Sequence, residues 1–158
     1  MAAGSGSAVP AVSAAGSGSA VPAVSAVRAL QAALAAEDAA FFGYGVAGAH
    51  LSGSRKSAAE QDWTGHNKAR DSLTAMISAL GATPVAAQAF YRLPFAVHDA
   101  STATALAAYL EDGVTRAYLG LVAVSGLKWR TFGALAMQDS ARRAAFWRGA
   151  TQAFPGLS

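Results

Sequence analysis

Apolar residues recur every three or four positions from residue 27 to residue 51, which is the spacing of one face of a helix. This first stripe consists of Val27, Leu30, Leu34, Glu37, Phe41, Tyr44, Gly48 and Leu51. The following Gly and Ser residues end the pattern. The pattern predicts one long helix with a carboxylate, Glu37, on its apolar face, whereas Asp38 falls off the stripe and is expected to be solvated or at the edge.

A second stripe of the same period predicts a second helix. It is expected to begin near Ser57, where Glu60 completes the pattern of a capping box, and to end at Gly81. Its inward residues are Trp63, His66, Arg70, Leu73, Ile77 and Leu80.

Two further stripes complete the helical pattern. Asp99 or Ser101 is suited to cap a third helix, which Gly126 is expected to close, and a fourth helix is predicted from near Lys128 to near Gly149. The third stripe is Thr104, Ala107, Glu111, Val114, Tyr118 and Leu121, and the fourth is Phe132, Leu135, Asp139, Arg142 and Phe146.

The connections between these helices predict an all-α fold. The first and third connections are short, so each joins an antiparallel pair. The middle connection contains Pro84 and Pro94, is long enough to run the length of a bundle, and is expected to include a short helix around residues 85–92. No segment alternates with period two for long enough to predict a strand. A four-helix bundle with one long crossover between helices two and three is the ferritin-like arrangement.

The N-terminal residues have a different composition from the rest of the chain. Residues 2–13 read "AAGSGSAVPAVS", and residues 14–25 repeat them letter for letter. Segments rich in Gly, Ser and Pro are typical of flexible tails, because they bury little apolar surface. We therefore expect a low-complexity tail over residues 1–25 and a bundle over residues 26–158.

Composition and charge exclude several classes of function. Of the 158 residues, 53% are hydrophobic and 13% are charged, and the net charge is +3 without a basic stripe, which argues against nucleic-acid binding. The chain has no cysteine, and therefore no disulfide or thiolate metal site. No apolar run approaches the ~20 residues needed to span a bilayer, and no signal peptide is recognisable. The default expectation is a cytoplasmic protein, unless an export segment has been removed.

Polar side chains occupy the middle of every predicted stripe. Helix midpoints fall at one level in an antiparallel bundle, so these side chains are expected to form one buried polar layer. The predicted layer consists of Glu37, His66, Arg70, Glu111, Asp139 and Arg142.

Two chemistries could satisfy such a layer. A di-metal carboxylate site needs a Glu on two helices and Glu-x-x-His on the other two. Glu37 and Glu111 match the lone Glu positions, but the other helices offer Trp63-x-x-His66 and Asp139-x-x-Arg142. Arginine cannot ligate a metal, so an internal ion network without a cofactor is favoured. The alternative is an iron or manganese site on Glu37, His66, Glu111 and Asp139.

Other features are weaker. The segment "GYGVAG" follows no strand and carries no dinucleotide-binding signal. Tyr44, Tyr109 and Tyr118 are expected to be core or bundle-edge aromatics. Alanine-rich faces and aromatics expected at the surface, such as Trp147, favour self-association as a homodimer.

Several segments together resemble an actinobacterial family of ferritin-like domains of unknown function. These are "AAEDAAFFGYGVAGAHL", "HNKARDSL", "GATPVAAQAFYRLPF", "AAYLEDGVTRAYLGLV" and "ARRAAFWRG…FPGL", and the resemblance covers roughly residues 27–157. It implies a ferritin-like bundle and brings no established activity. The ligand pattern of the wider ferritin-like group, which includes iron-oxidising and oxygen-activating enzymes, is matched at Glu37, Glu111 and, less closely, His66.

The sequence therefore favours a non-catalytic ferritin-like bundle held by a buried polar layer. Two alternatives stay open: a metal-dependent oxidoreductase or iron-handling protein, and a bundle that binds a small molecule in its core or under the residue 82–98 crossover.

Overall fold

The computed structural model describes residues 20–151, with side chains from residue 25 onward. It contains four helices in this range: α1 (Ala20–Ala49), α2 (Gly53–Ala79), α3 (Ala100–Val122) and α4 (Leu127–Arg148). Residues 20–151 contain no strand. The prediction of an all-α fold is confirmed.

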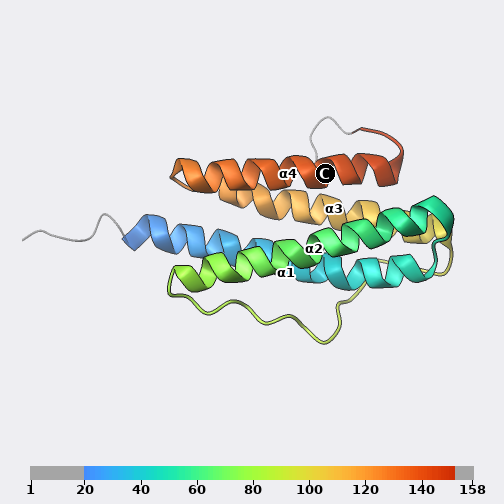
Figure 1. The fold of residues 1–158 in the computed structure, drawn as a ribbon, viewed down its shortest axis with the longest axis horizontal. Helices are drawn as coiled ribbons and strands as arrows, with labels where there is room; N and C mark the ends of the chain where they lie inside the picture. The colour runs from blue at the N-terminus through green and yellow to red at the C-terminus, as the bar shows by residue number, and fades with distance from the viewer. Residues whose placement is uncertain (1–19, 152–158) are drawn as a thin grey trace, which may run out of the picture.

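The helices form an antiparallel bundle with one long crossover (Figure 1). α1 and α2 run in opposite directions, and so do α3 and α4. The crossover, residues 80–99, returns along the length of the bundle and lets α3 begin at the same end as α2. The most extensive helix contacts are between α3 and α4, α1 and α2, and α1 and α3. This is the predicted four-helix topology.

The helix that was expected around residues 85–92 is not formed. The crossover instead lies against α1, where the Gln31 side chain donates to the Thr83 carbonyl at 2.7 Å and accepts from the Val85 backbone N–H at 2.8 Å. Within the segment, the Gln88 backbone N–H donates to the Tyr91 hydroxyl at 3.0 Å, where a helix would pair it with the carbonyl four residues earlier.

The start of α2 differs from the prediction. α2 begins at Gly53, preceded by Ser52, and Ser52 makes no side-chain cap. Gly53 has φ +55, a conformation that glycine adopts at little cost, so the chain turns into the helix earlier than Ser57. Ser57 lies inside the helix, and its hydroxyl donates to the Gly53 carbonyl. Gly81, with φ +76, follows the end of α2 as predicted.

The ends of α3 and α4 are set by local polar chemistry. Asp99 caps α3, and its side chain accepts from the Thr102 backbone N–H in a reciprocal capping box. α3 ends at Val122, before Gly126, which precedes α4 with φ +112 instead of closing α3. Gly149 ends α4 in the left-handed conformation, as expected for a helix C-terminus.

The core confirms the predicted inner faces of α1 and α3 but not that of α4. Buried members of the α1 and α3 stripes are Leu30, Leu34, Glu37, Tyr44, Ala107, Glu111, Val114, Tyr118 and Leu121. α4 instead buries Gly133, Ser140, Ala144 and Trp147. Its inner face lies one position further along the chain than predicted, and Trp147 is 1% exposed where a surface residue was expected.

Close packing against α3 explains this rotation of α4. A Cβ atom on Gly133 would lie 2.8 Å from Leu121 Cβ and 3.1 Å from the Tyr118 carbonyl oxygen. Only a glycine admits this approach, so the small residues of α4 face α3 and most of the bulkier predicted stripe turns outward. Phe132 of that stripe is the exception, because it stays partly buried against Tyr118. On α2, Trp63 and Leu80 of the predicted stripe are likewise 40% and 38% exposed.

The N-terminal repeat extends into α1. The helix begins at Ala20, within the second copy, and the rest of the predicted tail lies outside the described residues. No helix found in residues 20–151 is both long enough and apolar enough to cross a bilayer.

Candidate functional site: a buried Glu–His–Glu layer

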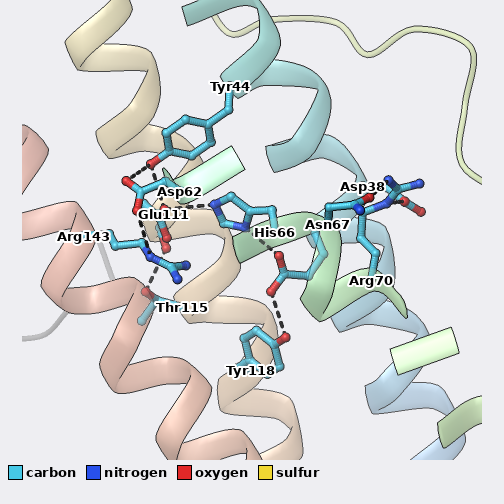
Figure 2. Close-up of polar contacts among 11 residues, drawn as sticks. Asp38, Tyr44, Asp62, His66, Asn67, Arg70, Glu111, Thr115, Tyr118 and Arg143 are labelled. Atoms are coloured by element: carbon cyan, nitrogen blue, oxygen red, sulfur yellow. Dashed lines mark hydrogen bonds and ion pairs between the residues drawn. The ribbon is translucent and has the colours of Figure 1, made fainter. Parts of the chain in front are cut away.

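Three helices each place one polar side chain at the same level of the core. Glu37 comes from α1, His66 from α2 and Glu111 from α3, and their exposed fractions are 3%, 0% and 0%. His66 Nδ1 lies 2.6 Å from Glu37 Oε2, and His66 Nε2 lies 3.0 Å from Glu111 Oε1. Figure 2 shows His66 beside Glu111, with Tyr44 and Tyr118 on either side of the layer. The structure thus brings together three of the six predicted layer residues.

Two tyrosines also donate to these carboxylates, Tyr118 to the Glu37 oxygen that His66 does not contact and Tyr44 to the same Glu111 oxygen as His66. Tyr118 donates from its hydroxyl to Glu37 Oε1 at 2.8 Å, and Tyr44 donates to Glu111 Oε1 at 2.8 Å. Burial and the nearby carboxylate charges raise the pKa of both phenols well above its ordinary value. Both tyrosines therefore remain neutral hydrogen-bond donors, which buried carboxylates need.

The position of His66 between two carboxylates favours its charged form. Burial by itself lowers the pKa of His66, but the hydrogen bonds to Glu111 and Glu37 and their charges raise it to about 9. A neutral imidazole has only one N–H, so one of its two nitrogens would face a carboxylate oxygen with a lone pair. At neutral pH His66 is an imidazolium that donates to both carboxylates.

α2 and α4 extend the polar layer toward one side of the bundle. Asp62 of α2 accepts from Trp147 Nε1 at 2.8 Å and pairs with Arg143 Nε at 3.1 Å, and Tyr44 lies 3.3 Å from the same carboxylate. Burial lowers the pKa of Arg143, but the charges of Glu111 and Asp62 outweigh it and raise the pKa. Arg143 fits here because α2 carries Gly65, where a Cβ atom would lie 3.0 Å from the guanidinium.

Arg143, Asp62 and Trp147 were not predicted as layer residues. For Arg143 and Trp147 the signal was the spacing of small residues in α4, since Gly133, Ser140 and Ala144 recur at helical intervals on the face that also carries Trp147. Asp62 lies on α2, where no such spacing marks it. Small residues contribute little to an apolar pattern, so the pattern identified the bulkier neighbouring stripe of α4 as the inner face.

Arg70 belongs to a separate ion pair. Its Nε donates to Asp38 Oδ1 at 2.5 Å, and its guanidinium lies 4.5 Å from the centroid of the Phe41 ring. Asp38 is only 4% exposed, so the expectation that it is solvated is wrong. Because Asp38 follows Glu37 directly, it points from another side of α1 and draws Arg70 away from the layer (Figure 2).

Asp139 and Arg142 lie outside the core. Arg142 Nη2 donates to Asp139 Oδ1 at 2.7 Å. The Asp139 side chain is 58% exposed and the Arg142 side chain is 73% exposed. The prediction that they join the buried layer is wrong, because the rotation of α4 turns both of them toward solvent.

The family of the chain follows from comparison with known proteins. A sequence family described as a domain of unknown function (DUF4439) matches residues 29–158. The chain belongs to this DUF4439 family. It is similar in structure to a conserved hypothetical protein, rv2844, from Mycobacterium tuberculosis, with 31% identity and a TM-score of 0.77. That match covers 80% of this chain and 96% of the other. Comparison with curated proteins gives no match.

The donors of this DUF4439 domain do not fit a di-metal carboxylate site. Both His66 nitrogens already face carboxylate oxygens, whereas a metal-bound imidazole needs a free lone pair. The inward residues of α4 at spacing i, i+3 are Ser140 and Arg143, where such a site would need Glu and His. No cluster of three or more His, Asp or Glu side chains suited to a metal ion occurs in the part of the chain that the structure describes.

Proposed function

We propose that this chain is a ferritin-like bundle whose ion layer has a structural role in place of a di-iron centre. In this proposal the layer fixes the register of α1, α2 and α3, and the domain has no catalytic activity of its own. The observation that carries it is the double engagement of His66 by Glu37 and Glu111.

The geometry supports a role in register because one imidazolium ties three helices together. A shift of one helix by a single residue moves its side chains by ~1.5 Å along the axis and by ~100° around it. Such a shift would break the hydrogen bonds of His66 and leave buried charges unpaired, which is strongly unfavourable. The layer therefore disfavours alternative packings of α1, α2 and α3.

The ferritin-like part of the proposal is supported by topology and by the positions of two carboxylates. The crossover joins α2 to α3, and Glu37 and Glu111 lie on the two helices that supply lone Glu ligands in ferritin-like sites. Arg143 brings a fixed positive charge close to Glu111, so a protein cation provides the charge that a metal would otherwise supply. The mycobacterial source of the matched structure supports the predicted actinobacterial distribution, while a cytoplasmic location stays a prediction.

Metal analysis and nitrogen NMR test this proposal together. We expect the chain, purified without chelator, to contain far less than one iron or manganese per molecule, and added Mn²⁺ to leave the thermal midpoint unchanged. We also expect ¹⁵N spectra at pH 7 to show that both His66 ring nitrogens carry a proton. The matched control is His50, which lies exposed at the end of α1 and outside the layer.

Stoichiometric iron or manganese that is lost in Glu37→Ala would contradict the structural proposal. Asp139→Ala is the control for that experiment, because Asp139 is exposed and outside the layer and its removal should leave any metal content unchanged.

One atom favours the metal-binding alternative as a second candidate. Glu111 Oε2 is buried and has no hydrogen-bond partner among the described residues. A single iron or manganese ion held by Glu111 and His66 Nε2 would satisfy this oxygen, with Glu37 hydrogen-bonded to the opposite nitrogen, Nδ1. This candidate is an oxidoreductase or iron-handling protein. It requires His66 to be neutral, so the nitrogen NMR experiment separates the two candidates.

A further inference from the structure

The outer face of α4 carries a largely exposed stripe, on which Phe146 contacts Arg55 of α2 and Trp147 of its own helix. Leu135 and Phe146 are 58% and 52% exposed, and the ion pair of Asp139 and Arg142 lies between them in sequence. At ~100° per residue these four side chains fall within about 60° of one another around the helix. We call this surface, Leu135, Asp139, Arg142 and Phe146, the α4 outer stripe.

The α4 outer stripe lies opposite the face that packs on α3. Gly133 and Ala144 are buried on the inner face, about half a turn away from Leu135. The sequence pattern wrongly predicted that this stripe faces the core.

The order of residues along the stripe is self-complementary. In an antiparallel pairing of two α4 helices, a twofold axis between Ser140 and Ala141 places residue 135 opposite residue 146, and residue 139 opposite residue 142. The apolar ends then meet each other, and each aspartate meets an arginine of the other copy. A parallel pairing in register would instead place like charges together, which is unfavourable.

We propose that a second copy of this chain binds the α4 outer stripe and forms a twofold-symmetric dimer. Leu135 contacts the partner's Phe146, and Asp139 pairs with the partner's Arg142. Each carboxylate then lies between two guanidiniums, one from its own helix and one from the other copy. This inference does not depend on the role of the buried layer, because none of these residues belongs to that layer.

A groove beside the stripe is suited to receive the partner's side chain. It lies between α2 and α4, has a volume of about 290 Å³, and its edge includes Phe146 and Arg142. The partner's Leu135, placed against Phe146, would lie at its mouth. Arg55 of α2 stands 5.8 Å from the centroid of the Phe146 ring, and the Trp147 ring packs at a steep angle against it. Phe146 nevertheless remains 52% exposed, which leaves surface for the partner.

Charge reversal tests the interface and its register. Sedimentation velocity over a wide range of concentration should show a monomer–dimer equilibrium for the unmodified chain. Asp139→Arg and Arg142→Asp should each weaken dimerisation at least about ten-fold, because each places like charges across the axis. The double variant Asp139→Arg/Arg142→Asp should restore dimerisation. Helix content should stay the same, and so should the thermal midpoint in dilute solution where the chain is monomeric, because both residues are exposed.

The matched control is Tyr109 on α3, which is 54% exposed and lies outside the stripe. Tyr109→Arg should leave dimerisation unchanged. A chain that is monomeric at every concentration, as it would be if residues 152–158 or another protein covered the stripe, overturns the proposal. A dimer that is sensitive to Tyr109→Arg and insensitive to the α4 reversals also overturns it.

Cross-linking gives an independent reading of the register, since the chain has no cysteine of its own. A mixture of Leu135→Cys and Phe146→Cys chains should form a disulfide-linked dimer under mild oxidation. Leu135→Cys alone should not, because the two copies of position 135 would lie about 16 Å apart along the paired helices, too far for a disulfide. Efficient cross-linking of Leu135→Cys alone would overturn the antiparallel register.

Discussion

Two ion clusters of similar composition have opposite environments in this molecule. The buried layer links Glu37, His66 and Glu111 with exposed fractions of at most 3%, whereas the pair of Asp139 and Arg142 is more than half exposed. Both consist of acidic and basic groups at hydrogen-bonding distance. Only the first connects different helices of the chain.

This difference shows that burial, more than contact distance, decides how much an ion pair contributes to the stability of a single chain. An exposed pair in a helix is screened by water and contributes at most ~0.5 kcal/mol. A buried pair has lost its hydration, so removal of one partner leaves an uncompensated charge. The buried layer should therefore make a large contribution to the stability of the domain. The exposed pair should contribute almost nothing to the stability of the monomer.

The largest expected difference between the two clusters appears when the cation of each is removed. His66→Ala leaves the carboxylates of Glu37 and Glu111 buried without their shared donor, and we expect a loss of about 3–5 kcal/mol in the free energy of unfolding. Arg142→Ala should change it by less than about 0.5 kcal/mol. Urea denaturation of both variants, in dilute solution where any dimer is dissociated, measures the comparison. Equal losses in the two variants would show that burial does not separate the clusters.

The next effect is the dependence of stability on pH. The pKa of His66 is about 9 in the folded chain, above its ordinary value near 6.5, so the proton stabilises the folded state. This stabilisation is complete below about pH 6.5 and is lost as the pH rises through about 9, and a difference of this size corresponds to about 3 kcal/mol. Urea denaturation from pH 6 to pH 10 should show the decline.

His66→Gln is the control for that titration, because it removes the titrating group and keeps a polar side chain. The decline should be much smaller in His66→Gln, with Arg142→Gln behaving as the unmodified chain. If His66→Gln loses stability over the same pH range to the same extent, the pH dependence does not come from the proton of His66.

The smallest of the three effects tests the rotation of α4, which decides that Asp139 is outside. Gly133→Ala brings a Cβ atom within 3.1 Å of the α3 backbone, and we expect a loss of about 1–3 kcal/mol. Gly120→Ala, on α3, meets no atom within 4 Å and should instead stabilise the helix by roughly 0.5–1 kcal/mol. Thermal unfolding of the two variants should give shifts of opposite sign, and a stabilising Gly133→Ala would contradict the rotation.

The sequence was sufficient to predict the faces of α1 and α3. Their stripes contain large apolar residues such as Leu30 and Leu121, so the period of 3.6 residues identifies an inner face. α3 buries more than the predicted stripe, since Leu106 and Leu110 are also in the core. The same stripes placed Glu37 and Glu111 in the core. His66 followed from the stripe of α2, even though Trp63 of that stripe is at the surface.

On α4 the hydrophobic period does not identify the inner face. It carries two stripes, one of bulky residues that include Leu135 and Phe146, and one of small residues that ends in Trp147. Hydrophobicity favours the first stripe as the inner face. Close approach to α3 requires the second, because only Gly133 leaves room for the Tyr118 carbonyl. That requirement depends on the distance between two helices, which no pattern within a single helix contains.

What the sequence by itself determined is therefore the four long helices and their order, the long crossover, and the two carboxylates that face the core from α1 and α3. The tertiary structure alone decided which cation neutralises which carboxylate. Arg70 pairs with Asp38, Arg143 reaches Asp62, and Arg142 faces solvent with Asp139. The physical reason is that a helical period fixes directions around one axis, whereas ion pairing depends on the rotation and separation of neighbouring helices.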